Sequence, residues 1–233
     1  EVTAHEIVHQ WFGNLVTPSD WKYLWLNESF ATYFGFRVVD HRYPEWGIWH
    51  QFIDATTDPA LERDALQETF SIEIPAGDQV AINAATAPII YNKGGSLLRQ
   101  IEGFIGADLF REGLRHYLDS HAYGCAASRH LWEAFEAVSE QPIMQMVKSW
   151  IEQPGFPIIE AERDGAELVL TQKRFTYLAH PYDQLWMVPV SIRVFDAAGG
   201  EKTVHRLMGN RTERIALGDD AAAYTVNSGR TGF

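Results

Sequence analysis

The chain has 233 residues, enough for one large domain or two small ones with ample apolar material for a core, since 46% of the residues are hydrophobic. Its net charge of −12 disfavours nucleic acid and anionic membrane surfaces as partners. No apolar run approaches the roughly eighteen residues that a transmembrane helix needs, and no signal-peptide pattern is present. Cys125 is the only cysteine, which excludes an intrachain disulfide and a thiol-ligated metal site and mildly favours a reducing, cytoplasmic location.

The first residues contain the pattern His-Glu-x-x-His, formed by His5, Glu6 and His9. A helix is predicted from Val2 to about Leu15. Because residues four apart lie on one face of a helix, the imidazoles of His5 and His9 can converge on one cation. Zn²⁺ takes imidazole nitrogen and carboxylate oxygen, and a catalytic site keeps one position open for water, so a third protein ligand is required. Glu6 lies beside the two histidines and can reach a water at that open position.

A second helix is predicted from about Trp21 to Val39, after a turn over residues 17–20. It contains Glu28, and a helical hairpin would bring this carboxylate to the same ion as the two histidines. The pattern on its own leaves open an alternative, in which the histidines lie on the surface beside a solvated glutamate.

Further helices are predicted as far as Ile151. An amphipathic segment runs to about Thr56, Asp58 is the expected N-cap of a short helix through Leu66, and Ser128 is the expected N-cap of a later one. The segment from Phe70 to Ala87 has weak periodicity and is predicted to be irregular; such a segment could line a cleft. The apolar stripes of these helices indicate helix core rather than a cofactor site.

Beyond residues 154–157, which read Pro-Gly-Phe-Pro, the hydrophobic period changes from 3.6 to 2. Apolar and other side chains alternate from Trp186 to Phe195, and residues 198–200, Ala-Gly-Gly, lead back into a second strand over 203–207. This pattern predicts a hairpin of a small β-sandwich or β-barrel. Pro189 suggests an edge position or a bulge.

Two segments carry a family resemblance. Residues 5–14, His-Glu-x-x-His-Gln-Trp-Phe-Gly-Asn, and residues 24–31, Leu-Trp-Leu-Asn-Glu-Ser-Phe-Ala, resemble the gluzincin aminopeptidases related to aminopeptidase N, and among these the archaeal tricorn-interacting aminopeptidases. The resemblance extends over almost the whole chain. It implies the mostly α-helical part of a thermolysin-like zinc peptidase domain over residues 1–154, followed by a small β-sandwich domain over 155–233. It also implies peptide substrates and one Zn²⁺ per chain, held by His5, His9 and Glu28, with Glu6 as general base.

The resemblance also selects one of the nine tyrosines, which composition and periodicity do not. Residues 90–99, Ile-Tyr-Asn-Lys-Gly-Gly-Ser-Leu-Leu-Arg, are similar to the family segment whose tyrosine hydrogen-bonds the transition state, and Tyr91 takes that role. Three departures are present. Tyr23 stands where the family usually has an acidic residue, the family often has a second tryptophan beside the one that follows Asp20, where this chain has Lys22, and Gly95 replaces a more usual alanine.

The family recognises a free amino terminus with a Gly-x-Met-Glu-Asn segment, which this sequence does not contain. We therefore expect the chain to be part of a longer protein whose N-terminal and C-terminal domains are its missing partners. Residues 1–233 alone are expected to be weakly active or inactive.

Other functions remain as alternatives at this stage: a thermolysin-like endopeptidase, a relative of the leukotriene epoxide hydrolase, or a non-catalytic interaction module. The context of Glu28 argues against the endopeptidase, and retention of every ligand argues against the module. The remaining histidines are expected to be structural or exposed: His41, His50, His116, His121, His130, His180 and His205.

Overall fold

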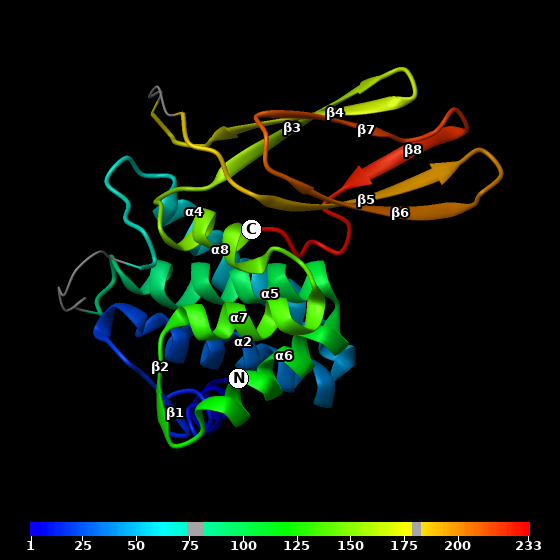
Figure 1. The fold of residues 1–233 in the computed structure, drawn as a ribbon. Coiled ribbons are helices and arrows are strands. Elements are labelled where there is room, and N and C mark those ends of the chain that lie inside the picture. Colours follow the sequence, from blue (N-terminus) through cyan, green and yellow to red (C-terminus); the bar gives the residue numbers. More distant parts are fainter. Residues whose placement is uncertain (74–81, 179–182) are drawn as a thin grey trace.

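The protein folds into a helical part followed by a part built from two antiparallel sheets, as predicted (Figure 1). The computed structural model describes residues 1–73, 82–178 and 183–233. Its helices and helical turns are α1 Val2–Val8, η1 Trp21–Tyr23, α2 Trp25–Arg42, η2 Pro44–Trp46, α3 Ile48–Phe52, η3 Ile53–Thr57, α4 Asp58–Asp64, η4 Pro88–Lys93, α5 Gly94–Ile105, α6 Ala107–His121, α7 Ser128–Ser139 and α8 Ile143–Ile151. Its strands are β1 Val16–Pro18, β2 Gly124–Ala126, β3 Pro157–Asp164, β4 Glu167–Arg174, β5 Val188–Asp196, β6 Glu201–Met208, β7 Thr212–Ala216 and β8 Ala221–Val226.

Helix α2 is the centre of the helical part. It contacts α1, α5 and η4, so its side chains are buried on several faces. Trp25, Phe30 and Tyr33 are at most 1% exposed, and the ring of Phe30 stacks on Phe12 with centroids 4.0 Å apart. The helix is thus held on several sides over its first turns, which gives Glu28 a defined position.

The metal-ligand helix is shorter than predicted. It ends at Val8 instead of Leu15, and the residues that follow form turns, in which Asn14 N donates to the carbonyl oxygen of His9 at 3.0 Å. Gly13 has a φ of +128°, which is not helical, so the helix cannot continue through the last predicted turn. After these turns, β1 pairs in parallel with β2 from a distant part of the sequence.

Three other predicted boundaries are also wrong in detail. The second helix is divided into η1 and α2, and Asp20 caps η1 by accepting a hydrogen bond from Lys22 N at 3.0 Å. Asp58 is not an N-cap, because the π-helical turn η3 runs directly into α4. Ser128 is the first residue of α7, and Ala127 precedes it as the cap residue. The predicted irregular segment falls partly on residues 74–81, and His180 also lies outside the described residues.

The sheets have the strand orders β3-β4-β7 and β6-β5-β8, all antiparallel. The predicted alternation of β5 is confirmed, since Val188, Val190, Ile192 and Val194 are buried. Pro189 pairs with Leu207 of β6, whereas pairing with β8 begins only at Ile192, so β5 has a strand on one side at the proline. The strand is central in its sheet, yet locally it is an edge, which a proline tolerates.

The last residues return from β8 to the helical part (Figure 1). Phe233 N donates to Gln100 Oε1 of α5 at 2.9 Å, and the Phe233 ring contacts Trp150 and Phe156. Buried apolar side chains from both parts form one continuous core. None of the helices described is both long enough and apolar enough to cross a membrane.

Candidate metal centre

Helices α1 and α2 bring the three predicted ligands together. His5 Nε2 and His9 Nε2 each lie 3.6 Å from Glu28 Oε2, and one ligand atom from each of the three residues lies within 4.8 Å of the others. The His5 and His9 rings meet edge to face, with centroids 5.0 Å apart. All three side chains are partly buried, with 16%, 24% and 15% of their surfaces exposed.

The spacing of these atoms fits a zinc ion. In a tetrahedral site with metal–ligand bonds of about 2.0–2.1 Å, neighbouring ligand atoms are about 3.3 Å apart, close to the separations seen here. The donor set of two imidazoles and one carboxylate also suits zinc and leaves a fourth position for water. Among residues 1–73, 82–178 and 183–233, no other group of three metal-binding side chains is so arranged.

The orientation of His9 is set by a contact outside the ligand set. Its Nδ1 lies 3.2 Å from the carbonyl oxygen of Phe12, in the turn after α1. When Nδ1 donates to this oxygen, Nε2 is left unprotonated and faces Glu28. The early end of α1 therefore contributes to the site, because a longer helix would engage the carbonyl groups of this turn.

Glu6 follows His5 on α1 and its side chain is exposed. Its charge is one of those that raise the pKa of Tyr91, so it acts on the same site as the ligands. A carboxylate here is accessible to water.

Tyr91 lies in the π-helical turn η4, opposite α1. Its ring lies 6.3 Å from that of His5, centre to centre, with the planes only 9° apart. Burial, then the charge and hydrogen bonding of Glu28, and then the charge of Glu6 raise the pKa of Tyr91 to about 12. The phenol is therefore protonated at neutral pH and can donate a hydrogen bond.

Two close contacts fix η4, the turn that contains Tyr91, against α2, the helix that contains Glu28. Ser29, the residue after Glu28, donates from Oγ to the carbonyl oxygen of Ile90 at 2.6 Å, and both residues are buried. Next to this contact, Gly94 lets α5 approach α2, since a Cβ on Gly94 would lie 1.9 Å from Ser29 Oγ. The residues beside Glu28 and beside Tyr91 thus determine how far apart these two side chains lie.

The surface beside Tyr91 is hollowed. A groove of about 460 Å³ is lined by Ile82, Ala84, Ala87, Pro88, Tyr91 and Asn92. A larger one of about 660 Å³ lies at the junction of the helical and β parts, lined by residues such as Phe156, Phe175 and Phe233, and none of the metal-site residues borders it. The smaller groove is therefore the one that borders the candidate metal centre, through Tyr91.

The other histidines in the described residues do not join the site. His121 and His130 stack with centroids 4.7 Å apart, and burial followed by the charges of His121 and Arg129 lowers the pKa of His130. Sequence reasoning did not identify Ser29 as a residue that holds η4 against α2, although it belongs to the segment already singled out for Glu28.

Comparison with known proteins agrees with this geometry. The model of the peptidase family M1 domain matches residues 1–150. Aminopeptidase M1 of Arabidopsis thaliana is 40% identical over 82% of this chain, and tricorn protease-interacting factor F2 of Thermoplasma volcanium is 41% identical over 81%. Leucyl aminopeptidase of Saccharolobus solfataricus is 35% identical over the whole chain.

The chain spans between 22% and 29% of the lengths of these relatives. The family match covers the helices that carry His5, His9, Glu28 and Tyr91. The chain therefore belongs to peptidase family M1.

Proposed function

We propose that the protein is a zinc-dependent aminopeptidase that removes N-terminal residues from peptides. The observation that carries the proposal is the convergence of His5, His9 and Glu28 opposite the phenol of Tyr91. Membership of family M1, and the aminopeptidase names of its relatives, support the same reaction.

Glu6 is the proposed general base. A zinc ion held by the three ligands would supply an acidified water and polarise the scissile carbonyl. Glu6 accepts the proton of the attacking water and returns it to the leaving amine. Its exposure on α1 leaves it free to exchange that proton between water and substrate.

Tyr91 is the proposed oxyanion donor. Its protonated phenol donates a hydrogen bond to the oxygen that becomes negative as the carbonyl is attacked. A fixed donor of this kind typically contributes about 3–4 kcal/mol to transition-state stabilisation.

The substitution Glu6→Gln in the full-length protein tests the assignment of the base. We expect kcat for an aminoacyl-naphthylamide to fall by about 10²–10⁴-fold, while zinc content is unchanged. Glu45→Gln, the same change at an exposed glutamate of η2, is the control and leaves kcat unaltered. Turnover by Glu6→Gln at the rate of the unsubstituted protein would show that the base lies elsewhere.

Blocking the α-amine of a peptide separates the proposed reaction from endopeptidase activity. Acetylation abolishes cleavage by an aminopeptidase and leaves cleavage by an endopeptidase intact. Equal rates on the free and the acetylated peptide would contradict the proposal.

A further inference from the structure

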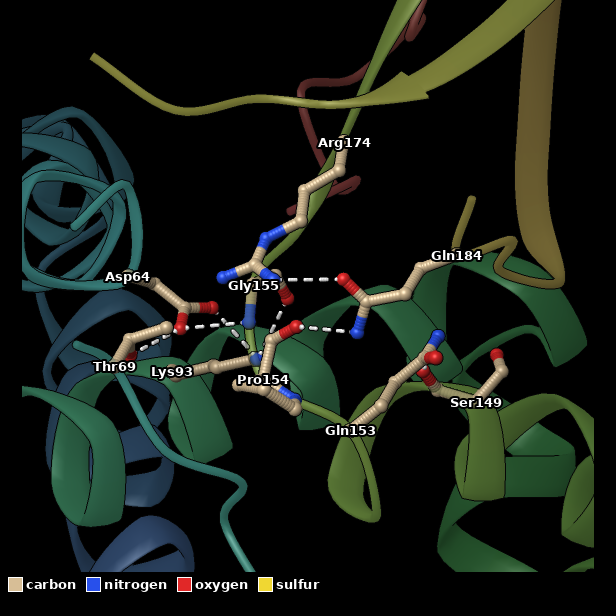
Figure 2. Close-up of polar contacts among 9 residues, drawn as sticks. All are labelled: Asp64, Thr69, Lys93, Ser149, Gln153, Pro154, Gly155, Arg174 and Gln184. Carbon is tan, nitrogen blue, oxygen red and sulfur yellow. Dashed lines mark hydrogen bonds and ion pairs between the residues drawn. The ribbon is translucent and has the colours of Figure 1, made fainter. Parts of the chain in front are cut away.

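A buried ion pair involves Lys93, the last residue of the turn η4 that contains Tyr91. Lys93 Nζ is 2.7 Å from Asp64 Oδ2, and both side chains are 0% exposed (Figure 2). The ammonium also donates to the carbonyl oxygen of Gly155 at 3.0 Å, and Asp64 Oδ1 accepts from Thr69 Oγ1 at 2.7 Å and from Gly155 N at 3.0 Å. Burial lowers the pKa of Lys93, and the charge of Asp64 opposes that shift.

The pair joins three segments that are far apart in the sequence. Asp64 ends α4, Lys93 ends η4, and Gly155 lies in the link between α8 and β3. Gly155 has a φ of +88°, and a Cβ there would lie 2.5 Å from Arg174 Nε. Arg174 Nη1 in turn donates to Gln184 Oε1 at 2.7 Å, and Gln184 Nε2 donates to the carbonyl oxygen of Pro154 at 3.3 Å (Figure 2). Residues of the β part thus cover the ion pair on the side away from the helices.

Stability alone does not explain a charged pair at this place. Removing two charges from water costs about as much as their attraction returns, so well-packed apolar side chains often stabilise a fold equally well. What the pair adds is fixed geometry, because Lys93 Nζ also donates to Gly155 and Asp64 Oδ1 accepts from both Thr69 and Gly155. The geometry fixed here is that of the turn η4.

Lys93 and Tyr91 lie on opposite sides of that turn. Residues two apart are separated by about 200° on an α-helix, and the wider π-helical turn keeps them on opposing faces as well. Lys93 attaches η4 to Asp64 of α4 on one side of the turn. The hydrogen bond from Ser29 to Ile90 attaches η4 to α2 on the other side. Tyr91 projects between these two attachments toward His5 and Glu28.

We infer that Lys93, paired with Asp64, is a positioning residue that fixes the Tyr91 phenol relative to the zinc ligands, and that the Pro154–Gly155 link of the β part completes this support. The inference rests on the proposed function, because it assigns to Lys93 an effect exerted through the oxyanion donor.

The test is a double-mutant cycle in the full-length protein, with kcat, KM and zinc content measured for each variant. Lys93→Met is expected to lower kcat by about 10–100-fold with KM within about twofold, since a displacement of about 1 Å can cost that much. Zinc content is unchanged, because α1 and α2 supply all three ligands. In a Tyr91→Phe background, Lys93→Met has almost no further effect on kcat, because the group it positions has been removed.

A control variant shows whether a loss of stability alone, without an effect on Tyr91, lowers kcat. Gln172→Leu is the matched control, since this buried amide of β4 joins Trp186 and Asn210 within the β part and touches neither α1 nor η4. It lowers the unfolding temperature while kcat is retained. If Lys93→Met fails to fold, Asp64→Asn takes its place, because the amide oxygen still accepts the bonds from Thr69 and Gly155 while the charge is lost.

Two results overturn the inference, and a third concerns the proposed function. If Lys93→Met lowers kcat as much in the Tyr91→Phe background as in the unsubstituted protein, or leaves kcat unchanged while Tyr91→Phe lowers it, then Lys93 does not act through Tyr91. If Tyr91→Phe itself has no effect, the proposed role of Tyr91 fails, and with it the inference.

Discussion

The two sides of the candidate site are held in different ways. On the ligand side, α1 has only seven residues, Val2 and Ile7 on it are 68% and 53% exposed, and His5 and His9 remain accessible. On the tyrosine side, η4 is tied to α2 through Ser29 and to α4 and the α8–β3 link through Lys93, and these contacts are buried. A single isolated turn or two of helix is marginal in water, so α1 depends on packing, and in the proposed centre a bound ion would stabilise it further.

This difference separates two kinds of substitution. Changes on the ligand side are expected to act on metal affinity, because in the proposed centre the ion would join α1 to α2. Changes on the tyrosine side are expected to act on kcat or on folding while the metal stays bound. The substitutions Tyr91→Phe, Gly94→Ala and Ser29→Ala test whether these three residues belong to the tyrosine side.

On the tyrosine side, the largest effect is expected for Tyr91→Phe. Loss of the phenolic hydrogen bond should lower kcat by about 10²–10³-fold, equivalent to about 3–4 kcal/mol, with zinc content unaltered. Tyr123→Phe, at a tyrosine that is 92% exposed and outside the site, is the control for the loss of a hydroxyl. Retained kcat in Tyr91→Phe, measured with an aminoacyl-naphthylamide, would remove Tyr91 from the site.

A smaller effect is expected for Gly94→Ala. The new Cβ would lie 1.9 Å from Ser29 Oγ and 2.9 Å from Ser29 Cβ, so η4 must move away from α2. We expect the free energy of unfolding to fall by about 1–3 kcal/mol and kcat to fall with it.

Gly95→Ala provides the neighbouring control, since its Cβ meets nothing closer than Thr32 Cγ2 at 3.3 Å, a contact that small shifts relieve. Chemical denaturation and steady-state kinetics measure both quantities. Equal behaviour of the two alanine variants would show that the close approach of α5 to α2 is unimportant.

The smallest effect is expected for Ser29→Ala. It removes one buried hydrogen bond to Ile90 and should lower the free energy of unfolding by about 1 kcal/mol, with a modest loss of kcat. Ser139→Ala removes a bond of the same length, from Ser139 Oγ to Phe135 O in α7, and also the longer bond from Gln141 N to Ser139 Oγ at 3.3 Å, both away from Tyr91. The control should therefore lose at least as much stability, yet only Ser29→Ala should lose kcat. A loss of kcat in both variants, or in neither, would contradict the assignment of Ser29 to the tyrosine side.

The order of the elements could be predicted from the sequence because its signals are local. Apolar periods of 3.6 and 2 give helices and then strands, and residues such as Val190 and Ile192 are buried as their alternation indicated. The end of α1 could not be predicted in this way, because the turns over residues 9–15 that follow it are held by a distant segment, with Tyr123 N donating to the carbonyl oxygen of Leu15 at 2.7 Å. The π-helical turn η3, which removes the cap expected at Asp58, has no local signature either.

In the candidate site, too, residues in local sequence patterns could be predicted and residues brought together by long-range packing could not. The spacing of His5 and His9 on one helix is a local pattern, and their approach to Glu28 follows from the helical hairpin that it suggested. Tyr91 came only from family resemblance, since nothing in its own segment shows that η4 faces α1. Asp64 could not be found at all, because its partner Lys93 is brought to it by the packing of α4 against η4.

Zinc content, measured by elemental analysis of the dialysed full-length protein and of its Glu28→Ala variant, tests the proposed metal centre most directly. We expect one tightly held zinc per chain in the unsubstituted protein and a loss of that zinc in the variant, because two imidazoles alone form an incomplete site. Zinc retained at full stoichiometry in Glu28→Ala, or absent from the unsubstituted protein, would contradict the three-ligand centre on which the proposed function depends.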